Sequence, residues 1–457
     1  MAWNKRSNII SPCNNDDSVE ESIVKKLGQS VFVIAALFSA SVVCAQAPVE
    51  IGSTGAADPR TPIAVPAFSA EPGRESLGLT LAQVLAYDLD FSGQVVVLPK
   101  EAYPAGASAL PADATKIDFA AWGQSKAEYL VHANVKLEGS EIVAECRLLD
   151  TRSGEQVVGK RLSIDQKFAR RLAHQFADII VEHLTGVPGC ATSQIVFSSG
   201  KAGSKEIYVA DYDGANAREL TQHRNISILP KFSPDGRKIA YLSYKDRYPF
   251  LYIMDLASGV SRPLSKAVGL NIAPSWSPDG SQLAITMSKD ANPEIYMVNQ
   301  DGSGLRRITN DKSVDTSPAI SPDGNRIAFV SDRGGTAQIY VMNLDGSGVT
   351  RLSKQGGNST DPEWSPDGKM ITYVAERKGE GLQIWVMQAN GENARALTST
   401  GGTNESPYFS PDSRHVMFTS SRSGTQLYTA TIDTGIVRQV PGFKGQGQGP
   451  SWGPRRP

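Results

Sequence analysis

The sequence predicts a multidomain fold of α/β plus all-β class, in which a small N-terminal mixed α/β domain precedes a six-bladed β-propeller closed by its C-terminal inner strand. Three observations predict it. A Ser-Pro-Asp motif recurs at nearly constant spacing, each repeat carries short stretches of alternating apolar residues, and the preceding part has strand and helix patterns without a repeat. A repeat of about forty residues with strand-like content is typical of propellers, whose blades are four-stranded sheets.

The repeat unit has a length of 44 or 45 residues, because the motif serines stand at 233, 277, 321, 365 and 410. Within residues 318–353 the chain reads PAIS, PDG, NRIAFVS, a polar loop, IYVMN, LDGSG and VTRLS. Alternating apolar residues mark strands, and Asp-Gly pairs mark hairpin turns. Four strands per repeat are therefore expected.

The aspartates of the motif are expected to shape the turn between the first and second strands. Proline presets φ at the first corner, Asp bonds its local backbone, and Gly accepts the positive φ that follows. Neighbouring sheets pack about 10 Å apart, whereas calcium ligands lie about 2.3 to 2.6 Å from the ion, so the motifs do not share a metal site. The aspartates are Asp235, Asp279, Asp323, Asp367 and Asp412.

Six second strands can be counted, which gives six blades. The first of them, IVFSS from residue 195, has no motif before it, while PSWGP at 450–454 resembles an inner strand with no blade after it. The two ends of the region 192–457 are therefore expected to complete one blade together, which removes an open seam from the ring.

The region 61–187 lacks the repeat and is expected to fold as the α/β domain. Its helices are predicted from apolar residues at helical spacing, and its strands from apolar runs bounded by glycine. The expected elements are a strand at 61–68, a helix from Leu77 to Gly93, a strand at 94–98, a short helix at 116–122, three strands between Tyr129 and Ile164, and a helix at 168–184.

The N-terminal residues 1–47 read as a signal peptide with an extended polar lead. Two lysines precede the apolar run 31–43, and Ala45-Gln46-Ala47 follows as a signal-peptidase pattern. The run has 13 residues, fewer than the roughly 20 that span a bilayer, so export is expected. Residues 48–60 carry little apolar material and are expected to form a mobile tail that can bind a partner.

Two cysteines, Cys146 and Cys190, remain after the expected cleavage. In an oxidising compartment they could form one disulfide or remain two unrelated buried thiols. Buried thiols are the favoured alternative, because cysteine is a common small core residue.

No pattern of a catalytic, metal or cofactor site was found. Lys and Arg number 46 against 47 for Asp and Glu, which gives no sign of a nucleic-acid partner. The five histidines are not spaced as metal ligands and are expected at the surface or at helix ends, and no Gly-x-Ser-x-Gly nucleophile motif occurs. The glycine pairs lie between short strands and do not precede helices, so they are not phosphate loops. Aromatic residues at 232, 276, 364, 409 and 452 are expected to pack in the core.

Several stretches resemble the TolB family, the periplasmic propeller proteins of the Tol-Pal system of Gram-negative bacteria. They are RTPIAVPAF (60–68), LAYDLDFSG (85–93), RLLDTRSG (147–154), HLTGVPG (183–189) and YVADYDG (208–214), together with the repeated SPDG turns. The resemblance covers essentially the whole chain after the signal. The α/β domain is its specific part, because exported peptidases carry similar propeller repeats.

This resemblance implies a monomeric, non-enzymatic scaffold without cofactor, located in the periplasm. It implies that the propeller binds the lipoprotein Pal and that the mature N-terminus, Pro48, Val49, Glu50 and Ile51, engages the inner-membrane protein TolA. Other outer-membrane or peptidoglycan-associated proteins are further candidate partners. The implied role is to maintain the outer membrane during constriction at cell division.

Candidate Pal-binding residues precede the proline of each inner strand. We expect them in variable loops at the propeller mouth, opposite the SPDG turns, where carboxylates accept hydrogen bonds and Ile272 supplies apolar contact. Solvated loop tips without a partner are the alternative. The candidates are Asn271, Ile272, Ala273, Asp315, Thr316, Ser317, Thr360, Asp361, Asn404 and Glu405.

Two other functions compete with the scaffold. An exported propeller-bearing peptidase would need a catalytic domain, which neither the region before the ring nor the few residues after SWGP supply. A carbohydrate- or metabolite-binding propeller is not excluded by the sequence and requires a binding experiment.

Overall fold

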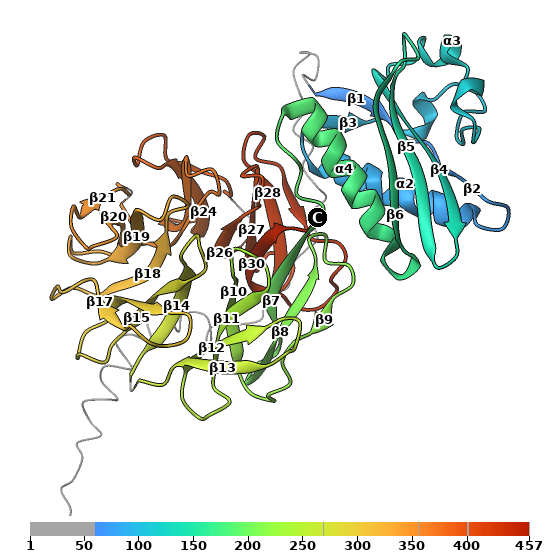
Figure 1. The fold of residues 1–457 in the computed structure, drawn as a ribbon. Helices are drawn as coiled ribbons and strands as arrows, with labels where there is room; N and C mark the ends of the chain where they lie inside the picture. The colour runs from blue at the N-terminus through green and yellow to red at the C-terminus, as the bar shows by residue number, and fades with distance from the viewer. Residues whose placement is uncertain (1–59, 268, 355, 400–401, 457) are drawn as a thin grey trace, which may run out of the picture. The chain divides into compact units, whose positions relative to one another are not determined.

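The computed structural model describes residues 60–456 apart from 268, 355, 400 and 401. The expected signal segment and the tail residues Pro48 to Ile51 lie outside the described residues. Among those described, six four-stranded sheets follow one mixed sheet along the chain (Figure 1). No described helix has the length and apolarity that a membrane span requires.

The mixed sheet carries two long helices on one face. Its strand order is β3-β1-β4-β5-β6, in which β1 runs parallel to β3 and β4 while β4, β5 and β6 form antiparallel pairs. The elements are β1 (Thr61–Ala64), β2 (Ser69–Ala70), α2 (Glu75–Phe91), β3 (Val95–Val97), η1 (Lys100–Ala102), η2 (Ala114–Lys116), α3 (Phe119–Trp122), β4 (Tyr129–Glu138), β5 (Glu141–Asp150), β6 (Gln156–Asp165), η3 (Gln166–Phe168) and α4 (Ala169–Thr185).

Helix α4 shows how the sequence determines this layer. Leu172, Phe176 and Ile180 are spaced by four residues, lie on one face of the helix and are fully buried in the core shared with α2 and the sheet. Gly186 ends the helix with φ 75°, a left-handed conformation that favours glycine. The predicted strand at 61–68 is shorter in the structure, because Pro66 has no backbone N–H for a ladder hydrogen bond.

The six blades are named here I to VI by the order of their inner strands. Blade I comprises β10 (Ser227–Phe232), β11 (Lys238–Ser243), β12 (Phe250–Asp255) and β13 (Ser261–Ser265); blade II, β14 (Asn271–Trp276), β15 (Gln282–Met287), β16 (Glu294–Asn299) and β17 (Arg306–Arg307); blade III, β18 (Asp315–Ile320), β19 (Arg326–Ser331), β20 (Gln338–Asn343) and β21 (Thr350–Arg351). Blade IV comprises β22 (Ser359–Trp364), β23 (Met370–Arg377), β24 (Gly381–Gln388) and β25 (Arg395–Ala396); blade V, β26 (Asn404–Phe409), β27 (His415–Ser420), β28 (Gln426–Thr431) and β29 (Val437–Gln439); blade VI, β30 (Gln448–Arg455), β7 (Ser193–Lys201), β8 (Ser204–Asp211) and β9 (Arg218–Glu219).

Blade VI confirms the predicted closure of the ring. The last strand, β30, lies beside β7 (Figure 1). The two strands pair antiparallel, and Trp452 lies opposite Ile195. The indole Nε1 of Trp452 donates a hydrogen bond of 2.6 Å to Ser193 Oγ. The two ends of the propeller region are thus held by one sheet, which leaves no free inner edge at this blade.

The aromatic residues at blade spacing are buried, as predicted. Trp276 and Trp364 also donate their indole N–H to the backbone carbonyl groups of Lys231 and Ala319 on the preceding blades, at 3.2 and 3.1 Å. These bonds satisfy the polar atom of a buried indole and connect neighbouring sheets.

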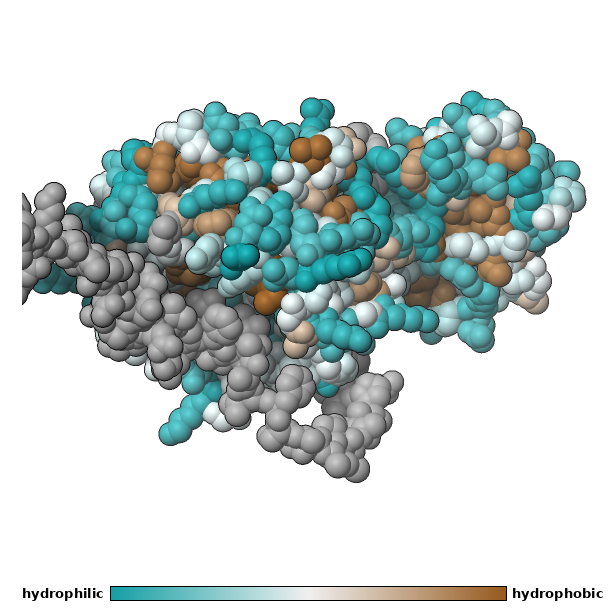
Figure 2. Space-filling view, turned by 90° about the horizontal axis from the view of Figure 1, so that it is seen from below, coloured by the Kyte–Doolittle hydropathy of each residue, from teal (hydrophilic) through white to brown (hydrophobic). Residues whose placement is uncertain are grey.

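The face of the molecule in Figure 2 is mainly hydrophilic, and hydrophobic residues appear on it in separate patches.

The buried polar residues differ from the sequence expectation in one respect. His132, His174 and His415 are buried, although all five histidines were expected at the surface or at helix ends. Each buried ring lies within hydrogen-bond distance of one oxygen acceptor. The acceptors are Pro111 O for His132, the Asp88 carboxylate for His174 and Phe91 O for His415. Helical and strand patterns could not reveal these partners, because they come from distant segments. Cys146 and Cys190 are both buried and free, as favoured.

Candidate functional site

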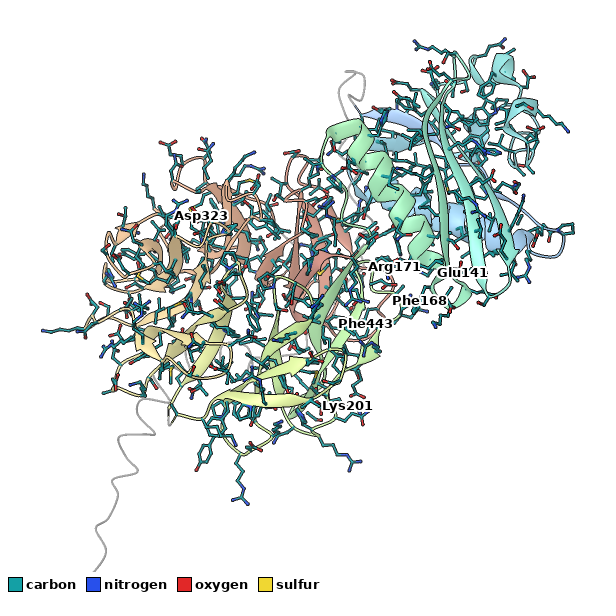
Figure 3. All side chains as sticks on the ribbon, in the orientation of Figure 1. Glu141, Phe168, Arg171, Lys201, Asp323 and Phe443 are labelled. Carbon is teal, nitrogen blue, oxygen red and sulfur yellow. The ribbon has the colours of Figure 1, made fainter. Side chains whose placement is uncertain are left out.

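The SPDG turns have the structural role that their chemistry predicts. In all five motifs the serine Oγ donates to the aspartate Oδ1 at 2.5 to 2.6 Å, and the same oxygen accepts the backbone N–H two residues later at 3.0 to 3.1 Å. Asp323 is one example, in the turn between β18 and β19 (Figure 3). The aspartates are therefore engaged within their own turns.

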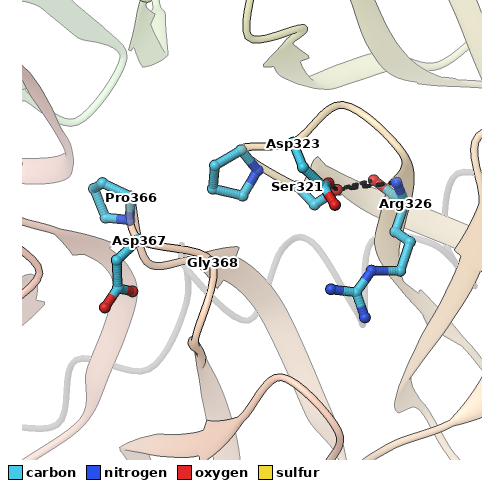
Figure 4. A pocket seen from close by; sticks show the side chains of 7 residues that line it. Ser321, Asp323, Arg326, Pro366, Asp367 and Gly368 are labelled. Atoms are coloured by element: carbon cyan, nitrogen blue, oxygen red, sulfur yellow. Dashed lines mark hydrogen bonds between the residues drawn. The ribbon is translucent and has the colours of Figure 1, made fainter.

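Shallow pockets lie between adjacent turns on this face. One has a volume of ≈ 360 Å³ and is lined by Ser321, Asp323, Arg326, Asp367 and their neighbours (Figure 4). The Arg326 backbone N–H donates to Ser321 Oγ at 2.9 Å, while its guanidinium lies 4.7 Å from the centre of the Trp364 ring. Ser321 and the Arg326 backbone N–H are thus bonded within the turn, and the Arg326 guanidinium packs on Trp364.

The residues predicted at the propeller mouth lie at the opposite end of the inner strands. They are part of the strands and do not lie in loops. Asn271 to Ala273 lie in β14, Asp315 to Ser317 in β18, Thr360 and Asp361 in β22, and Asn404 and Glu405 in β26. The prediction of variable loops is wrong here, because the residues before each proline already pair with the second strand.

Three of the candidates are fully buried and form hydrogen bonds inside the propeller. Asn271 Nδ2 donates to the backbone carbonyls of Ala267 and Gly269, and Asn404 Nδ2 donates to Gln383 Oε1 at 2.9 Å. Asp315 accepts two bonds from Arg333. Ile272, expected to supply apolar contact, is also buried in the core of blade II. In this structure these four side chains are engaged inside the propeller, and Asn404 bonds across to Gln383 of the neighbouring blade IV.

Every inner strand contains a β-bulge immediately before and at its proline. The pairing skips two residues, and the residue before proline takes a positive φ of 49° to 56°. This left-handed conformation is uncommon outside glycine, and only blade VI has glycine there. The bulge residues are Leu229, Ala273, Ser317, Asp361, Ser406 and Gly449.

The bulges receive support from the neighbouring blades. The freed N–H of Ser317 donates to Thr286 Oγ1 of blade II at 3.1 Å, and that of Gly449 donates to Thr419 Oγ1 of blade V at 2.9 Å. A bulge re-aims the side chains next to it. Here the bulge stands at the same position of all six inner strands. We call the bulge residues and the residues directly before them, Ile228, Ile272, Thr316, Thr360, Glu405 and Gln448, the mouth.

Directly after each proline lies a second set of residues, the axial ring, composed of Lys231, Ser275, Ala319, Glu363, Tyr408 and Ser451. Lys231 Nζ of blade I forms an ion pair of 3.1 Å with Glu363 Oε2 of blade IV. It also lies 4.3 Å from the centre of the Tyr408 ring of blade V. These contacts cross the ring axis below the mouth.

The charges at the mouth are concentrated on blades IV and V. Burial and the neighbouring Asp361 carboxylate raise the pKa of Glu405 to about 7. Burial also raises the pKa of Asp361 and of Glu363, while Lys231 opposes the change in both. A carboxylate with a raised pKa is stabilised by an added cationic partner. Blades I and II present Leu229 and Ala273 instead, both half-buried.

Sequence reasoning missed the axial ring, the mouth residues of blades I and VI, and Ser406 of blade V. The signal was present at the position after each inner-strand proline, where the six repeats read Lys, Ser, Ala, Glu, Tyr and Ser. A lysine and a glutamate at equivalent positions of blades three repeats apart are able to meet only if the repeats close into a ring of six. The blade count was therefore needed before this pair could be predicted.

Comparisons with known proteins agree with this architecture. Residues 181–456 match the family described as TolB beta propeller domain, and residues 49–157 match the TolB amino-terminal domain. The chain is similar to a solved structure of TolB from Acinetobacter baumannii, with 28% identity and a TM-score of 0.77, covering 87% of this chain and 97% of that one.

Curated relatives are similar over shorter stretches. The Tol-Pal system protein TolB of Syntrophotalea carbinolica is 35% identical over 218 residues, which are 46% of this chain and 49% of that protein. The protein of the same name from Geobacter sulfurreducens is 37% identical over 164 residues, 36% of this chain and 37% of that protein. The chain thus spans about half the length, or less, of these relatives. Since the propeller match alone covers more than half of the chain, the protein belongs to the TolB family.

Proposed function

We propose that this protein is a non-enzymatic scaffold of the Tol-Pal system in the periplasm. Its propeller mouth binds the lipoprotein Pal, and its N-terminal residues Pro48 to Ile51 bind TolA. Through these two partners it supports outer-membrane integrity and constriction at cell division. Family membership and the names of the relatives support the assignment to the Tol-Pal system.

The asymmetric mouth is the observation that carries the proposal for Pal. Asp361 and Glu405 provide carboxylates whose raised pKa favours a cationic contact, and the half-buried Leu229 and Ala273 provide apolar surface on other blades. The Lys231–Glu363 pair closes the axis beneath them. A polar, positively charged segment with an apolar neighbour fits such a surface, since binding sites combine apolar anchors with a few placed polar groups.

Calorimetry with purified Pal tests this assignment. The double variant Asp361→Asn/Glu405→Gln keeps the shape of the mouth and removes its charge, so we expect Pal to bind at least about tenfold more weakly, a loss of about 1.4 kcal/mol. The matched control is Glu392→Gln, because Glu392 is exposed in the outer hairpin of blade IV. Equal binding by the double variant and the wild type would contradict the proposed site.

A second experiment addresses TolA and the competing function. Deletion of residues 48–57 should abolish binding to TolA while the propeller melts at nearly the same temperature, because the tail lies outside the repeat region. A large fall in melting temperature would show a structural role for the tail instead. A panel of glycans is tested beside Pal, and specific glycan binding without Pal binding would favour the carbohydrate-binding alternative.

A further inference from the structure

The turn of blade V differs from the four other SPDG-type turns. Asp235, Asp279, Asp323 and Asp367 are exposed, whereas Asp412 is buried. Asp412 Oδ1 makes the usual turn bonds with Ser410 Oγ and the Arg414 N–H, but Oδ2 has no hydrogen-bond partner among the described residues. A buried carboxylate oxygen without a hydrogen bond is costly and requires an explanation.

His415, three residues later, faces the same place with a free ring nitrogen. Its Nε2 lies 2.8 Å from the carbonyl oxygen of Phe91, which only accepts hydrogen bonds, so Nε2 carries a proton. The other nitrogen, Nδ1, is buried and has no hydrogen-bond partner among the described residues; it lies 3.8 Å from Asp412 Oδ1. In the neutral ring Nδ1 therefore presents a lone pair toward Asp412.

Cys190, in the link between α4 and β7, completes the group. Ligand atoms of Cys190, Asp412 and His415 all lie within 4.8 Å of one another, and all three residues are buried. Among the described residues no other group of three or more such side chains meets this distance. We propose that Cys190, Asp412 and His415 form a binding site for a divalent metal ion of the zinc class.

The donor set fits zinc in type and supplies three of the four tetrahedral ligands. Zinc takes thiolate at about 2.3 Å and imidazole or carboxylate at about 2.0 to 2.2 Å, in a tetrahedral arrangement. These bond lengths separate ligand atoms by about 3.3 to 3.8 Å, so movements of about 1 Å bring the three atoms onto one ion. The hydrogen bond from Nε2 to Phe91 O orients the ring as an outer-shell partner does in metal sites.

The thiol must lose its proton when the ion binds. Burial and the Asp412 carboxylate raise the pKa of the Cys190 thiol well above its usual value, so the thiol is protonated before the ion arrives. Metal binding breaks the S–H bond, forms the metal–sulfur bond and releases the proton to solvent. The thiolate and the carboxylate then supply two negative charges against the two positive charges of the ion and the one of Arg414, so the site keeps one positive charge. Arg414, with Nη1 3.7 Å from Asp412 Oδ2, keeps its other nitrogen on Thr185 Oγ1.

The position of the site gives the ion a structural role. Cys190 belongs to the link, Asp412 and His415 to blade V, and Phe91 to the end of α2. The Phe91 ring also stacks on His415 with 4.4 Å between centroids. An ion bound there would join the link to blade V and hold the histidine against α2. Because the ligands are buried, the ion would enter while the chain folds.

Refolding with metal tests the proposal. The chain from residue 48 is unfolded, refolded with Co²⁺ or Zn²⁺ and dialysed, and its metal content, cobalt–thiolate absorption and melting temperature are measured. We expect about one ion per chain, a thiolate-to-cobalt charge-transfer band and a higher melting temperature than after refolding with a chelator. Cys190→Ser should lose the band, and His415→Gln should bind cobalt at least about tenfold more weakly.

Cys146→Ser is the matched control, because Cys146 is the other buried free thiol and belongs to no such group among the described residues. This variant should retain the ion and the band. The proposal is overturned if the wild-type chain refolds without bound metal, if bound cobalt shows no thiolate band, or if Cys146→Ser removes the band. Circular dichroism of each variant separates loss of the ion from loss of the fold.

Discussion

Lys231 and Glu363 form a 3.1 Å ion pair between inner strands of blades I and IV, which lie opposite each other in the ring of six. Both side chains are about one quarter exposed or less. A pair in this position connects two blades that share no sheet, and it sets the floor of the proposed binding mouth.

Replacing Lys231 with Met should therefore destabilise the propeller, because Glu363 would keep a half-buried carboxylate without its cation. We expect a loss of about 1 to 3 kcal/mol in the free energy of unfolding, measured by urea denaturation. The double variant Lys231→Met/Glu363→Leu should recover most of this loss, since no charge is then left unpaired. A double variant less stable than the single one would contradict this explanation.

Asp279 should stabilise the fold at neutral pH and lose this contribution in acid. Hydrogen bonds from Ser277 and Ser281 lower the pKa of Asp279 to about 2, compared with 3.8. Its contribution is thus present above about pH 4 and is lost as the pH falls through 2. We expect less than about 1 kcal/mol, since this side chain is exposed. Thermal melts from pH 5 to pH 2 should show a smaller acid-induced decrease in Asp279→Asn than in the wild type; equal decreases would argue against the effect.

Glu405 should change stability with pH in the opposite direction to Asp279. Its pKa is raised from 4.5 to about 7, so its stabilising contribution is present below about pH 4.5 and is lost as the pH rises through 7. Glu405→Gln should remove this loss and gain about 1 to 2 kcal/mol of stability relative to wild type at pH 8. If Pal supplies a cation, its affinity for the wild type should rise between pH 6 and 8, with a weaker rise in the variant. A pH-independent affinity of the wild type would exclude Glu405 as a contact.

Tyr212 should stabilise the contact between α2 and the propeller. Its hydroxyl donates to the buried Asp88 carboxylate at 2.5 Å, and Asp88 is also bonded to His174. Tyr212→Phe should cost about 1 to 3 kcal/mol in unfolding free energy, because the buried carboxyl group of Asp88 loses a hydrogen-bond donor. Tyr252→Phe is the matched control, since Tyr252 donates to the exposed Asp246 at 2.7 Å. Similar losses in the two variants would show that burial of the acceptor has no effect.

The sequence was sufficient to predict the local and periodic features of the fold. Pro, Asp and Gly determine each SPDG turn through neighbouring atoms, and the spacing of Leu172, Phe176 and Ile180 determines the buried face of α4. The same periodicity predicted the closure of blade VI. The start of the repeat region lacks an inner strand, and its end supplies an inner strand without a blade after it.

Features that depend on distant segments could not be predicted. The residues before the inner-strand prolines were expected in loops, but they lie in strands that contain a β-bulge. A bulge is defined by the register of the paired strand, which the local sequence does not contain. Asn404 was predicted at the surface but is buried, because Gln383 from another strand bonds it. The group of Cys190, Asp412 and His415 joins positions more than two hundred residues apart, and none of their spacings resembles a metal motif.

The central claim is that Pal binds at the mouth and not at the SPDG face. Calorimetry with Pal on two variants of blade III tests it most directly: Thr316→Arg places a cation at the half-buried mouth, and Asn325→Arg places one in the exposed turn at the other end of the blade. We predict at least about tenfold weaker binding, about 1.4 kcal/mol, for Thr316→Arg and wild-type binding for Asn325→Arg. Wild-type affinity for Thr316→Arg together with a loss for Asn325→Arg would contradict the account.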